Sequence, residues 1–542
     1  MAVLNFKGKT FVQNHHLAVK YHQLVPQKDK SLTDKVSLND NLIIHGDNLK
    51  ALKALLPTYA GKIKCIYIDP PYNTGNENWV YNDNVNSPMM QEWLGKVVDK
   101  EDFTRHDKWL CMMMPRLKLL RELLREDGVI FVSIDDNEQH RLRILMDEVF
   151  GEVNFIANII WQKKFSPQND AKYFSDNHDF IVCYAKNKIE GEQKSGWIIN
   201  LLPRTEDMAE RYKNPDNDSR GVWTSGDVSV KTYSKEYDYP ITTPSGKEVK
   251  PPRGACWRFS KEKFQELVND NRIWFGEKGD NVPRIKRFLS EVQSGLVPVT
   301  IWLHQDVGHN QQARQELKEI FSDADFPFET PKPISLIKRI IQLSTDKNSL
   351  ILDSFAGSGT TAHAVMELNK EDGGNRRFIL VECEDYADKI TAERARRVIK
   401  GVPNAKDDKL KEGLGGTFSY FELGDPIEME SILEGDKLPG YLELARYVFY
   451  TATGEEFDPG KVDEERNFIG ESKDYEVYLF YKPDIEYLRT TALTLDKARN
   501  LGEYKNKKRL VFAPSKYLDH DYLLEYRIDY CQLPFEIYKL KG

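Results

Sequence analysis

Residues 69–72 of the chain, Asp-Pro-Pro-Tyr, combine the groups needed to hold a flat ring that carries an amine. The carboxylate of Asp69 can accept a hydrogen bond from an amino group, and a backbone carbonyl fixed by Pro70 and Pro71 can accept a second. Together these acceptors would orient the nitrogen lone pair toward an electrophile. Tyr72 offers a face on which an extruded base could stack, a contact worth about 1–3 kcal/mol. The residue types are therefore compatible with chemistry on an exocyclic amine, such as its methylation.

A second group, residues 353–360 (Asp-Ser-Phe-Ala-Gly-Ser-Gly-Thr), has the composition of a turn that a ligand can approach closely. Gly357 and Gly359 lack a Cβ, so the backbone itself can contact the ligand. A helix expected from Thr361 onward would direct its positive end at the same place, which favours the carboxylate of a methionine moiety. About 25 residues later an apolar run ends at Glu382, a spacing that suits binding of ribose hydroxyls. These features predict a site for a cofactor that carries a nucleoside.

Both groups also have a purely structural explanation. The two prolines can form a rigid turn with Tyr72 in the core, a Gly-x-Gly sequence can be a simple turn, and Glu382 can be a solvated strand end. A dinucleotide or ATP site is disfavoured, because residues 353–360 lack the third glycine of GxGxxG and the chain contains no GxxxxGK[ST] sequence. His178 is expected to be structural, since an amine that attacks a methyl donor directly requires no histidine base.

Apolar runs place each group at the end of a strand. The run 63–68 leads into Asp69, and the run 349–353 leads into the Gly-x-Gly turn. Further strands are expected at 42–45, 129–134, 156–161, 179–184 and 378–382, with helices at 48–56, 109–125, 136–149, 333–344 and 385–400. Strand–helix–strand units with short connections predict an α/β fold with a doubly wound, mostly parallel sheet. Ligands bind such sheets at the carboxyl ends of the strands, where both groups would lie.

Composition limits the class of protein. No apolar run approaches the roughly 18 residues that cross a bilayer, and the N-terminus lacks the pattern of a signal peptide. The six cysteines are scattered without metal-binding spacing, so we expect a cytoplasmic protein that needs no metal. The net charge of −8 neither supports nor excludes nucleic-acid binding, because local patches decide phosphate contacts.

Several motifs in one order resemble the amino-methyltransferases of the β arrangement, especially the modification subunits of type III restriction–modification systems. The resemblance covers most of residues 40–400 and rests on IHGDNLKAL (44–52), DPPYNTG (69–75), GVIFVSIDDNE (128–138), MDEVFGEVNFI (146–156), WQKK (161–164), HDFIVCYAK (178–186), FETPKP (328–333) and DSFAGSGTT (353–361). In that family the catalytic motif precedes the cofactor motif, and a target-recognition region separates them. The resemblance implies S-adenosylmethionine as methyl donor and adenine N6 of double-stranded DNA as acceptor.

The family's roles are carried onto matching positions only. Asp69, Pro70, Pro71 and Tyr72 look like the catalytic tetrad that holds a flipped adenine. The cofactor-binding residues implied by the resemblance are Asp353, Phe355, Ala356, Gly357, Gly359 and Thr360 in the loop, Glu382 for the ribose, Asp47 for the cofactor adenine, and Thr330 and Lys332 for the methionine end. Asp47 could equally be an Asx turn or a helix cap.

The family pattern also predicts the domain organisation. We expect an N-terminal extension (1–40), a catalytic half (41–190), an irregular α+β target-recognition insertion (191–325), a cofactor-binding half (326–404) and a C-terminal α+β module (405–542). The C-terminal module is acidic, with 28 Asp and Glu against 20 Lys and Arg from residue 401 onward. It could serve docking or dimerisation, or it could simply complete the fold.

Within the expected insertion, residues 228–290 combine basic and aromatic side chains. This stretch holds 13 Lys and Arg against 8 Asp and Glu, and aromatic side chains such as Tyr233, Trp257 and Trp274 lie between them. The mixture suits contacts to phosphates and stacking near a flipped base. The candidate DNA contacts are Arg253, Arg258, Arg284, Lys286 and Arg287, although any single one could be an ordinary surface charge.

Other functions remain open at this point. The same machinery could methylate cytosine N4, although Asp rather than Ser at position 69 and the family match favour adenine. The acceptor could instead be RNA or a protein amide, or the chain could be a non-catalytic DNA-recognition subunit. No Walker A lysine or nuclease constellation is visible, so a restriction or helicase subunit would be a separate chain. A homodimer is also expected.

Overall fold

The computed structural model describes residues 4–74, 104–167, 171–189, 196–204, 210–291, 295–322, 328, 330–427, 438–502 and 506–533. The chain divides into two compact units. The main unit comprises residues 1–199 and 299–542, and the inserted unit comprises residues 200–298.

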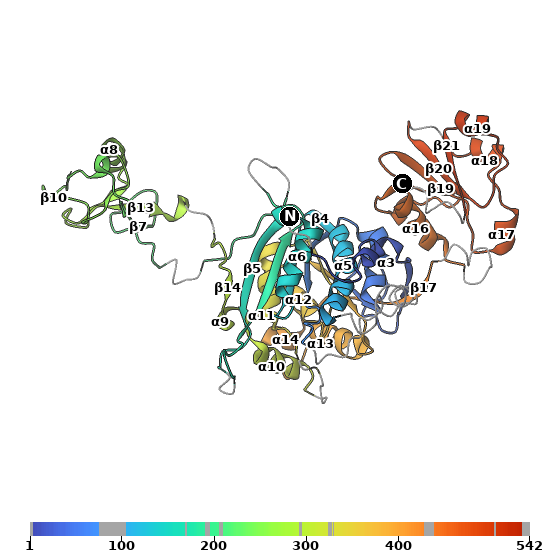
Figure 1. Cartoon of the computed structure of the whole chain (residues 1–542), viewed down its shortest axis with the longest axis horizontal. Coiled ribbons are helices and arrows are strands. Elements are labelled where there is room, and N and C mark those ends of the chain that lie inside the picture. The colour runs from blue at the N-terminus through green and yellow to red at the C-terminus, as the bar shows by residue number, and fades with distance from the viewer. Residues whose placement is uncertain are drawn as a thin grey trace. The chain divides into compact units, whose positions relative to one another are not determined.

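A ten-stranded sheet forms the centre of the main unit (Figure 1). Its order is β1 (His22–Pro26), β17 (Ser419–Pro426), β2 (Leu42–His45), β16 (Arg377–Glu382), β15 (Leu350–Asp353), β3 (Ile63–Ile68), β4 (Leu124–Ile134), β6 (His178–Ala185), β5 (Phe155–Gln162) and β14 (Ile301–Trp302). Neighbouring strands are parallel except where β1 or β6 takes part. The central strands are almost wholly buried, as expected where helices cover both faces of a parallel sheet.

Helices pack on the sheet in two groups. One group is α3 (Asn48–Tyr59), α5 (Arg105–Leu123) and α6 (Gln139–Phe150), and the other is α11 (Ile334–Ser344), α12 (Thr360–Asp372) and α13 (Glu393–Lys400). Ile66 and Ile68 of β3 lie in the core that includes α3 and α5, whereas Cys65 on the alternate face contacts Ser344 of α11. Side chains of successive strand residues point to opposite faces. The predicted doubly wound α/β fold is therefore confirmed.

The structure differs from the sequence prediction at several element and domain bounds. Strand β4 begins at Leu124, before the end of the helix expected at 109–125 and ahead of the strand expected at 129–134. Strand β1 belongs to the expected N-terminal extension and β17 to the expected C-terminal module, yet both are part of the main sheet, where β17 pairs with β1 and β2. Likewise β14, α9 (His304–Val307) and α10 (Asn310–Ile320) fall in the main unit, although residues 191–325 were expected to form the insertion. Most of these elements are short, and α10 is polar apart from three buried residues, so apolar runs mark them poorly.

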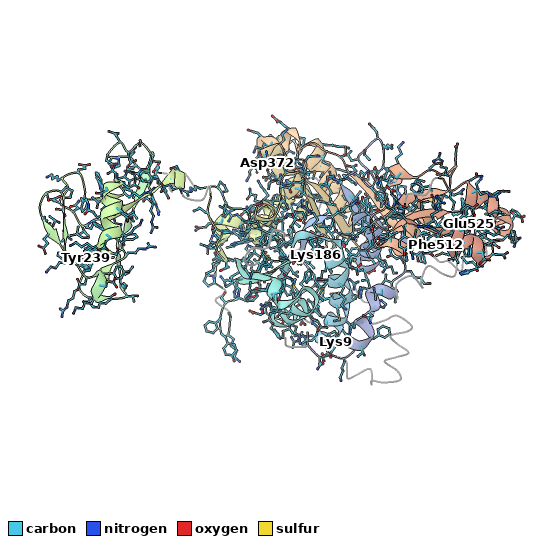
Figure 2. All side chains as sticks on the ribbon, turned by 90° about the horizontal axis from the view of Figure 1, so that it is seen from above. Lys9, Lys186, Tyr239, Asp372, Phe512 and Glu525 are labelled. Atoms are coloured by element: carbon cyan, nitrogen blue, oxygen red, sulfur yellow. The ribbon has the colours of Figure 1, made fainter. Side chains whose placement is uncertain are left out.

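The inserted unit is a small α+β assembly (side chains in Figure 2). Its sheets are β12–β13–β7 (Ile273–Trp274, Arg284–Phe288, Trp223–Asp227), β11–β8 (Cys256–Trp257, Ser229–Val230) and β10–β9 (Glu248–Val249, Ile241–Thr242), and its helix is α8 (Lys261–Asn269). Trp257 and Phe264 are buried in its core. The Trp257 indole donates to the Tyr239 carbonyl at 2.7 Å, and the Tyr239 hydroxyl donates to the Phe259 carbonyl at 3.0 Å. These bonds fix part of the irregular backbone.

Beyond β17, the C-terminal part of the main unit has a sheet of its own. It consists of β18 (Phe468–Glu471), β19 (Tyr475–Leu479), β20 (Lys508–Ala513) and β21 (Ile528–Gln532), together with α16 (Tyr441–Thr453). The ring centroids of Tyr447 in α16 and Tyr21 are 4.8 Å apart, and the Phe457 amide donates to the Pro57 carbonyl of α3 at 3.3 Å. Across the described part of the chain, no helix has the length and apolar composition needed to span a bilayer.

Candidate active site at the carboxyl ends of the central strands

Four neighbouring strands end along one edge of the main sheet. Their order is β2, β16, β15 and β3, and the register pairs Glu382 with His45 and Asp353 with Leu380. Leu352 of β15 pairs with Ile66 of β3. The turn that follows β15 and the Asp-Pro-Pro-Tyr corner that follows β3 therefore lie at adjacent strand ends, which is where ligands bind to sheets of this kind.

The catalytic corner is built around Asp69. Its Oδ2 atom forms an ion pair with the Lys332 ammonium, and its Oδ1 atom is buried without a hydrogen bond among the described residues. The Tyr72 hydroxyl is likewise buried and unbonded, while the residue as a whole is partly exposed. The Lys332 nitrogen lies 5.2 Å from the centroid of the Tyr72 ring and 6.0 Å from that of Trp161. The corner thus holds one unused acceptor beside an aromatic ring.

Helix α5 fixes the backbone of this corner. The Trp109 indole donates to the Pro71 carbonyl at 2.7 Å, so the Pro70 carbonyl is the better candidate for the predicted contact to an amine. Asn73 has a left-handed φ of 58° and donates to the buried Glu138 carboxylate, which also binds His106. The sequence showed Glu138 and Trp109 only as parts of a motif and a helix. Gly75, the last residue of the motif, lies outside the described residues.

The turn after β15 requires both of its glycines. Gly357 and Gly359 have φ values of +51° and +77°, which L side chains adopt at a cost. A Cβ on Gly359 would lie 2.9 Å from the Thr391 carbonyl oxygen, and a Cβ on Gly357 would lie 3.1 Å from the Phe328 ring. Phe328, for which no role was predicted, therefore covers this turn. Helix α12 begins directly afterwards at Thr360.

Glu382 lies against this turn. Its Oε2 atom accepts from the Gly357 amide at 2.7 Å, and its Oε1 atom accepts from the amides of Cys383 and Glu384 at 2.9 and 3.0 Å. Burial raises the pKa of Glu382 to about 7. The side chain therefore supports the turn, and contact with a ribose stays a prediction.

Three residues predicted to touch the cofactor form the framework of the loop. Asp353 is buried and accepts from the Thr361 hydroxyl at 2.6 Å and from the Phe355 amide at 3.1 Å. Burial raises the pKa of Asp353 to about 7. Phe355 packs in the main core, and the Ala356 amide donates to the Val381 carbonyl at 3.1 Å. Asp353 is thus a positioning residue, because both of its oxygens are used inside the loop.

Thr330 and Lys332, predicted to bind the methionine end of the cofactor, have different surroundings in the structure. The Lys332 carbonyl accepts from the Thr360 hydroxyl at 3.2 Å, whereas its ammonium points to Asp69 rather than into the loop. Thr330 is exposed. Thr360 also accepts from Arg394 at 2.8 Å. Lys332 therefore joins the Asp-Pro-Pro-Tyr corner to the turn after β15, a link that its place in the sequence did not indicate.

Asp47 forms the helix cap that the sequence offered as an alternative. Its Oδ1 accepts from the Lys50 amide at 2.9 Å, and its Oδ2 pairs with the buried Arg116 of α5 at 3.2 Å. Arg116 also donates to Asn48, which in turn donates to the Ser354 carbonyl at 3.0 Å. Helix α5 thus stabilises both the corner and the loop. A contact from Asp47 to the cofactor stays a prediction.

The candidate DNA contacts of the inserted unit differ in accessibility. Arg253, Arg258 and Arg287 are exposed, and Arg284 is exposed while paired with Asp227 at 2.9 Å. Lys286 is buried, and its ammonium pairs with Asp216 and Asp218. The assignment of Lys286 to DNA binding is therefore corrected, because its charge is neutralised inside the fold.

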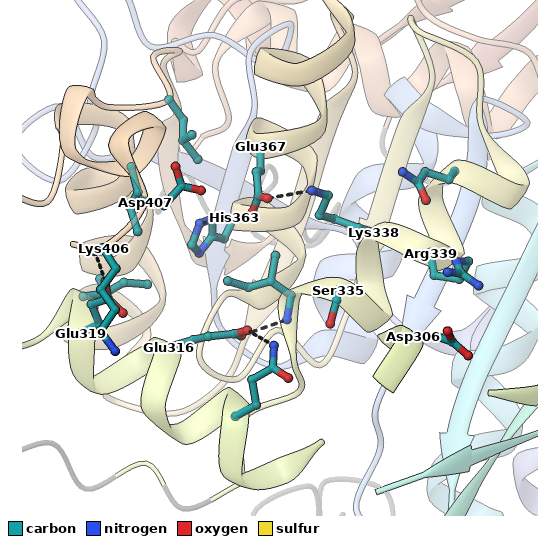
Figure 3. A pocket seen from close by; sticks show the side chains of 16 residues that line it. Asp306, Glu316, Glu319, Ser335, Lys338, Arg339, His363, Glu367, Lys406 and Asp407 are labelled. Atoms are coloured by element: carbon teal, nitrogen blue, oxygen red, sulfur yellow. Dashed lines mark hydrogen bonds and ion pairs between the residues drawn. The ribbon is translucent and has the colours of Figure 1, made fainter. Parts of the chain in front are cut away.

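A separate cavity of about 440 Å³ lies among α10, α11 and α12 (Figure 3). Two of its charged side chains, Lys338 and Glu367, form an ion pair at 2.7 Å. Burial raises the pKa of Glu316, which accepts from the Ile334 amide at 3.2 Å. No group of His, Cys, Asp and Glu in the described ranges has the geometry of a metal site.

Comparison with known proteins agrees with this arrangement. The DNA methylase family model (N6_N4_Mtase) matches residues 63–393. The chain is 32% identical over 452 residues to the type III StyLTI Mod subunit of Salmonella typhimurium, covering 78% of this chain and 66% of that subunit. It is 33% identical to the EcoPI Mod subunit of Escherichia phage P1, covering 79% of this chain and 73% of that subunit. The type II methyltransferase M.KpnI of Klebsiella pneumoniae is also 33% identical, with 70% and 93% covered.

Among solved structures, the M1.HpyAVI–SAM complex has a TM-score of 0.31 at 13% identity and covers 65% of this chain and 98% of that chain. The cytosine-N4-specific PvuII DNA methyltransferase has a TM-score of 0.33 at 12% identity, with 65% and 86% covered. The chain spans about two thirds of the length of the StyLTI subunit. On the family match and the identities of the curated relatives, the chain belongs to the N6/N4 family of DNA methylases.

Proposed function

We propose that the chain is a site-specific DNA methyltransferase that transfers a methyl group from S-adenosylmethionine to N6 of an adenine extruded from double-stranded DNA. The observation that carries the proposal is the adjacency of the Asp-Pro-Pro-Tyr corner and the Gly-Ser-Gly turn, joined by Lys332. Aspartate at position 69 and the similarity to type III Mod subunits favour adenine over cytosine.

The cofactor loop fits the methyl donor. Gly357 leaves backbone accessible beside the Phe328 ring, whereas Gly359 lets the turn pack against the Thr391 carbonyl, and α12 begins directly after the turn at Thr360. Glu382 would bind the ribose and Asp47 the adenine, each at the end of a neighbouring strand. When bound, S-adenosylmethionine supplies a methyl group on a sulfonium that an amine attacks directly. The chain's contribution is alignment and electrostatics.

The acceptor amine would bind at the catalytic corner. The free Oδ1 of Asp69 and the Pro70 carbonyl accept its two hydrogens, which directs the nitrogen lone pair toward the cofactor loop. Tyr72, a partly exposed residue whose hydroxyl is buried, would stack on the base. Once the new bond has formed, the Asp69 carboxylate is placed to accept the proton that the amine loses.

The biological setting follows from the relatives. Their names place them in type III restriction–modification enzymes as Mod subunits, and we propose the same for this chain or a related orphan enzyme. It would act in the cytoplasm as a homodimer, with a restriction subunit on a separate chain. The inserted unit would read the DNA through Arg253, Arg258, Arg284 and Arg287, which are exposed.

Single-molecule sequencing of DNA from a methylation-free host that expresses the chain tests the proposal. We expect N6-methyladenine at one short recurring sequence, and none in a host that expresses Asp69→Ala at the same level. N4-methylcytosine at that sequence would show that the acceptor is cytosine and not adenine. DNA without any modified base would contradict the proposed activity.

A further inference from the structure

The connection between β5 and β6 exposes large aromatic side chains. Phe165 is 55% exposed, Tyr173 is 83% exposed and Phe174 is 95% exposed. We name this connection, in its described residues 163–167 and 171–177, the aromatic loop. A cluster of exposed apolar side chains this dense marks an interaction surface more often than chance exposure.

The aromatic loop begins at the catalytic edge of the sheet. Because β6 is antiparallel to both β4 and β5, strand β5 runs in the same direction as β4 and ends at the same edge. Its Trp161 ring lies 6.0 Å from the Lys332 ammonium that pairs with Asp69. Lys163, the first residue of the loop, pairs with the buried Asp179 at 2.7 Å. The loop is therefore anchored beside the catalytic corner.

Internal contacts give the loop a defined base. The Phe165 ring stacks on the His304 ring at a centroid distance of 5.5 Å and lies tilted against the His309 ring at 5.7 Å. The Asn177 side chain donates to the Lys164 carbonyl at 3.3 Å. Tyr173 and Phe174 extend from this base into solvent, which suits them to a partner rather than to the core.

The charged residues of the aromatic loop indicate what kind of partner it binds. Lys164 and Lys172 have no carboxylate partner among the residues that the structure describes, unlike Lys163, which binds Asp176 and Asp179. The Lys172 nitrogen lies 5.6 Å from the Tyr173 ring centroid. Unpaired cations beside exposed rings fit phosphates beside bases, whereas the cores of protein–protein interfaces are depleted of charge.

We propose that the aromatic loop is a wedge that enters the DNA stack beside the target nucleotide. Tyr173 and Phe174 occupy the space that the extruded adenine leaves, and Lys164 and Lys172 contact the flanking phosphates. Extrusion costs a few kcal/mol in lost pairing and stacking, and inserted rings offset part of that cost. The inference rests on the proposed function, because it supplies the step that brings the base to Asp69 and Tyr72.

The test compares a Tyr173→Ala/Phe174→Ala double variant with Tyr517→Ala, which removes a 79% exposed ring from another part of the main unit. Each protein is assayed on the duplex sequence found by sequencing, once fully paired and once with the target adenine opposite an abasic site. For the double variant we expect kcat/KM to fall about 10- to 100-fold on the paired duplex. On the abasic duplex, where pairing is already lost, it should recover to within about threefold of the wild type. The Tyr517→Ala control should match the wild type on both.

Fluorescence of 2-aminopurine at the target position gives an independent readout, because it reports extrusion without methyl transfer. The wild type should raise this fluorescence on the paired duplex, and the double variant should not. An equal loss of activity on both duplexes, an unchanged rate, or unchanged 2-aminopurine fluorescence would overturn the wedge. If sedimentation showed that the double variant changes its oligomeric state, the wedge would be overturned, and the aromatic loop would instead be a contact between two copies of the chain. A wild type that extrudes the base but transfers no methyl group would contradict the proposed function and leave the wedge supported.

Discussion

Lys332 and Asp69, 263 residues apart in the chain, form an ion pair at the carboxyl edge of the main sheet. The carbonyl of the same lysine accepts a hydrogen bond from Thr360 at the start of α12. One residue thus connects the corner proposed to hold the adenine with the loop proposed to hold the methyl donor. The position of Asp69 relative to the donor depends on this connection.

Replacing Lys332 by Met should lower kcat for methylation about 10- to 100-fold, because Asp69 loses the partner that fixes its orientation. Lys332→Arg should restore part of the rate, and the Kd of S-adenosylmethionine should change little in either variant. Steady-state kinetics and calorimetric titration check this. If Lys332→Met instead weakened cofactor binding at unchanged kcat, the lysine would serve the methionine end, as the family resemblance implied.

Asp69→Ala and Tyr72→Ala should each reduce methyl transfer by at least about 100-fold, since the first removes the amine acceptor and the second the stacking face. Titration with S-adenosylmethionine should remain close to that of the wild type, because neither side chain belongs to the loop that follows β15. Full activity in either variant would refute the catalytic assignment of that residue.

Gly357→Val should weaken S-adenosylmethionine binding at least about 100-fold. The backbone there has a φ of +51° and a Cβ would press on Phe328 at 3.1 Å. Gly373→Val is the matched control, since its φ is +66° but nothing lies within 4 Å of the added carbon. Similar cofactor affinity in the two variants would show that close backbone approach is not required.

Much of the fold could be predicted because apolar runs and short connections define strands, helices and their order. The edge positions of Asp69, Gly357 and Glu382 followed from the strands that precede them. Contacts across the fold could not be predicted in this way. The bond from Trp109 to Pro71 and the link from Arg116 through Asn48 to Ser354 join residues whose spacing carries no periodic signal.

Lys286 shows why a count of charges was insufficient for the inserted unit. Its acidic partners Asp216 and Asp218 lie about 70 residues earlier, before the stretch in which the basic excess was counted. Burial and pairing depend on the folded unit. Of the five basic residues predicted to contact DNA, four are therefore exposed and one is buried. A local excess of charge predicts a patch better than it predicts the members of that patch.

Substitutions can distinguish a buried, paired basic residue from an exposed one that contacts DNA. Lys286→Met should destabilise the protein by about 1–3 kcal/mol, because Asp216 and buried Asp218 lose a charged hydrogen-bond donor, although Asp218 keeps its pair with Arg220. Arg287→Ala should leave the melting temperature unchanged while weakening DNA binding and reducing the slope of its salt dependence by about 1. Thermal melts and binding titrations at several salt concentrations distinguish them. Unchanged stability in Lys286→Met would contradict the buried pairing.

Asp353 should make stability depend on pH. Burial raises its pKa from 3.8 to about 7, so between about pH 4 and 7 the folded state keeps a proton that the unfolded state has lost. Stability therefore falls as pH rises through this range. In Asp353→Asn this contribution is absent, so the variant's unfolding free energy relative to the wild type should rise with pH by up to about 1.4 kcal/mol per unit. Denaturant titrations from pH 4.5 to 8 check this, and a constant difference would contradict the burial of an ionisable Asp353.

The central claim is that the corner after β3 and the turn after β15 form one site that methylates adenine. Its most direct test is to incubate the protein with tritiated S-adenosylmethionine and duplex DNA, digest the DNA and separate the nucleosides. The account predicts label in N6-methyldeoxyadenosine, and almost none with Asp69→Ala or Gly357→Val. Label in N4-methyldeoxycytidine, or label in N6-methyldeoxyadenosine that survives both substitutions, would contradict it.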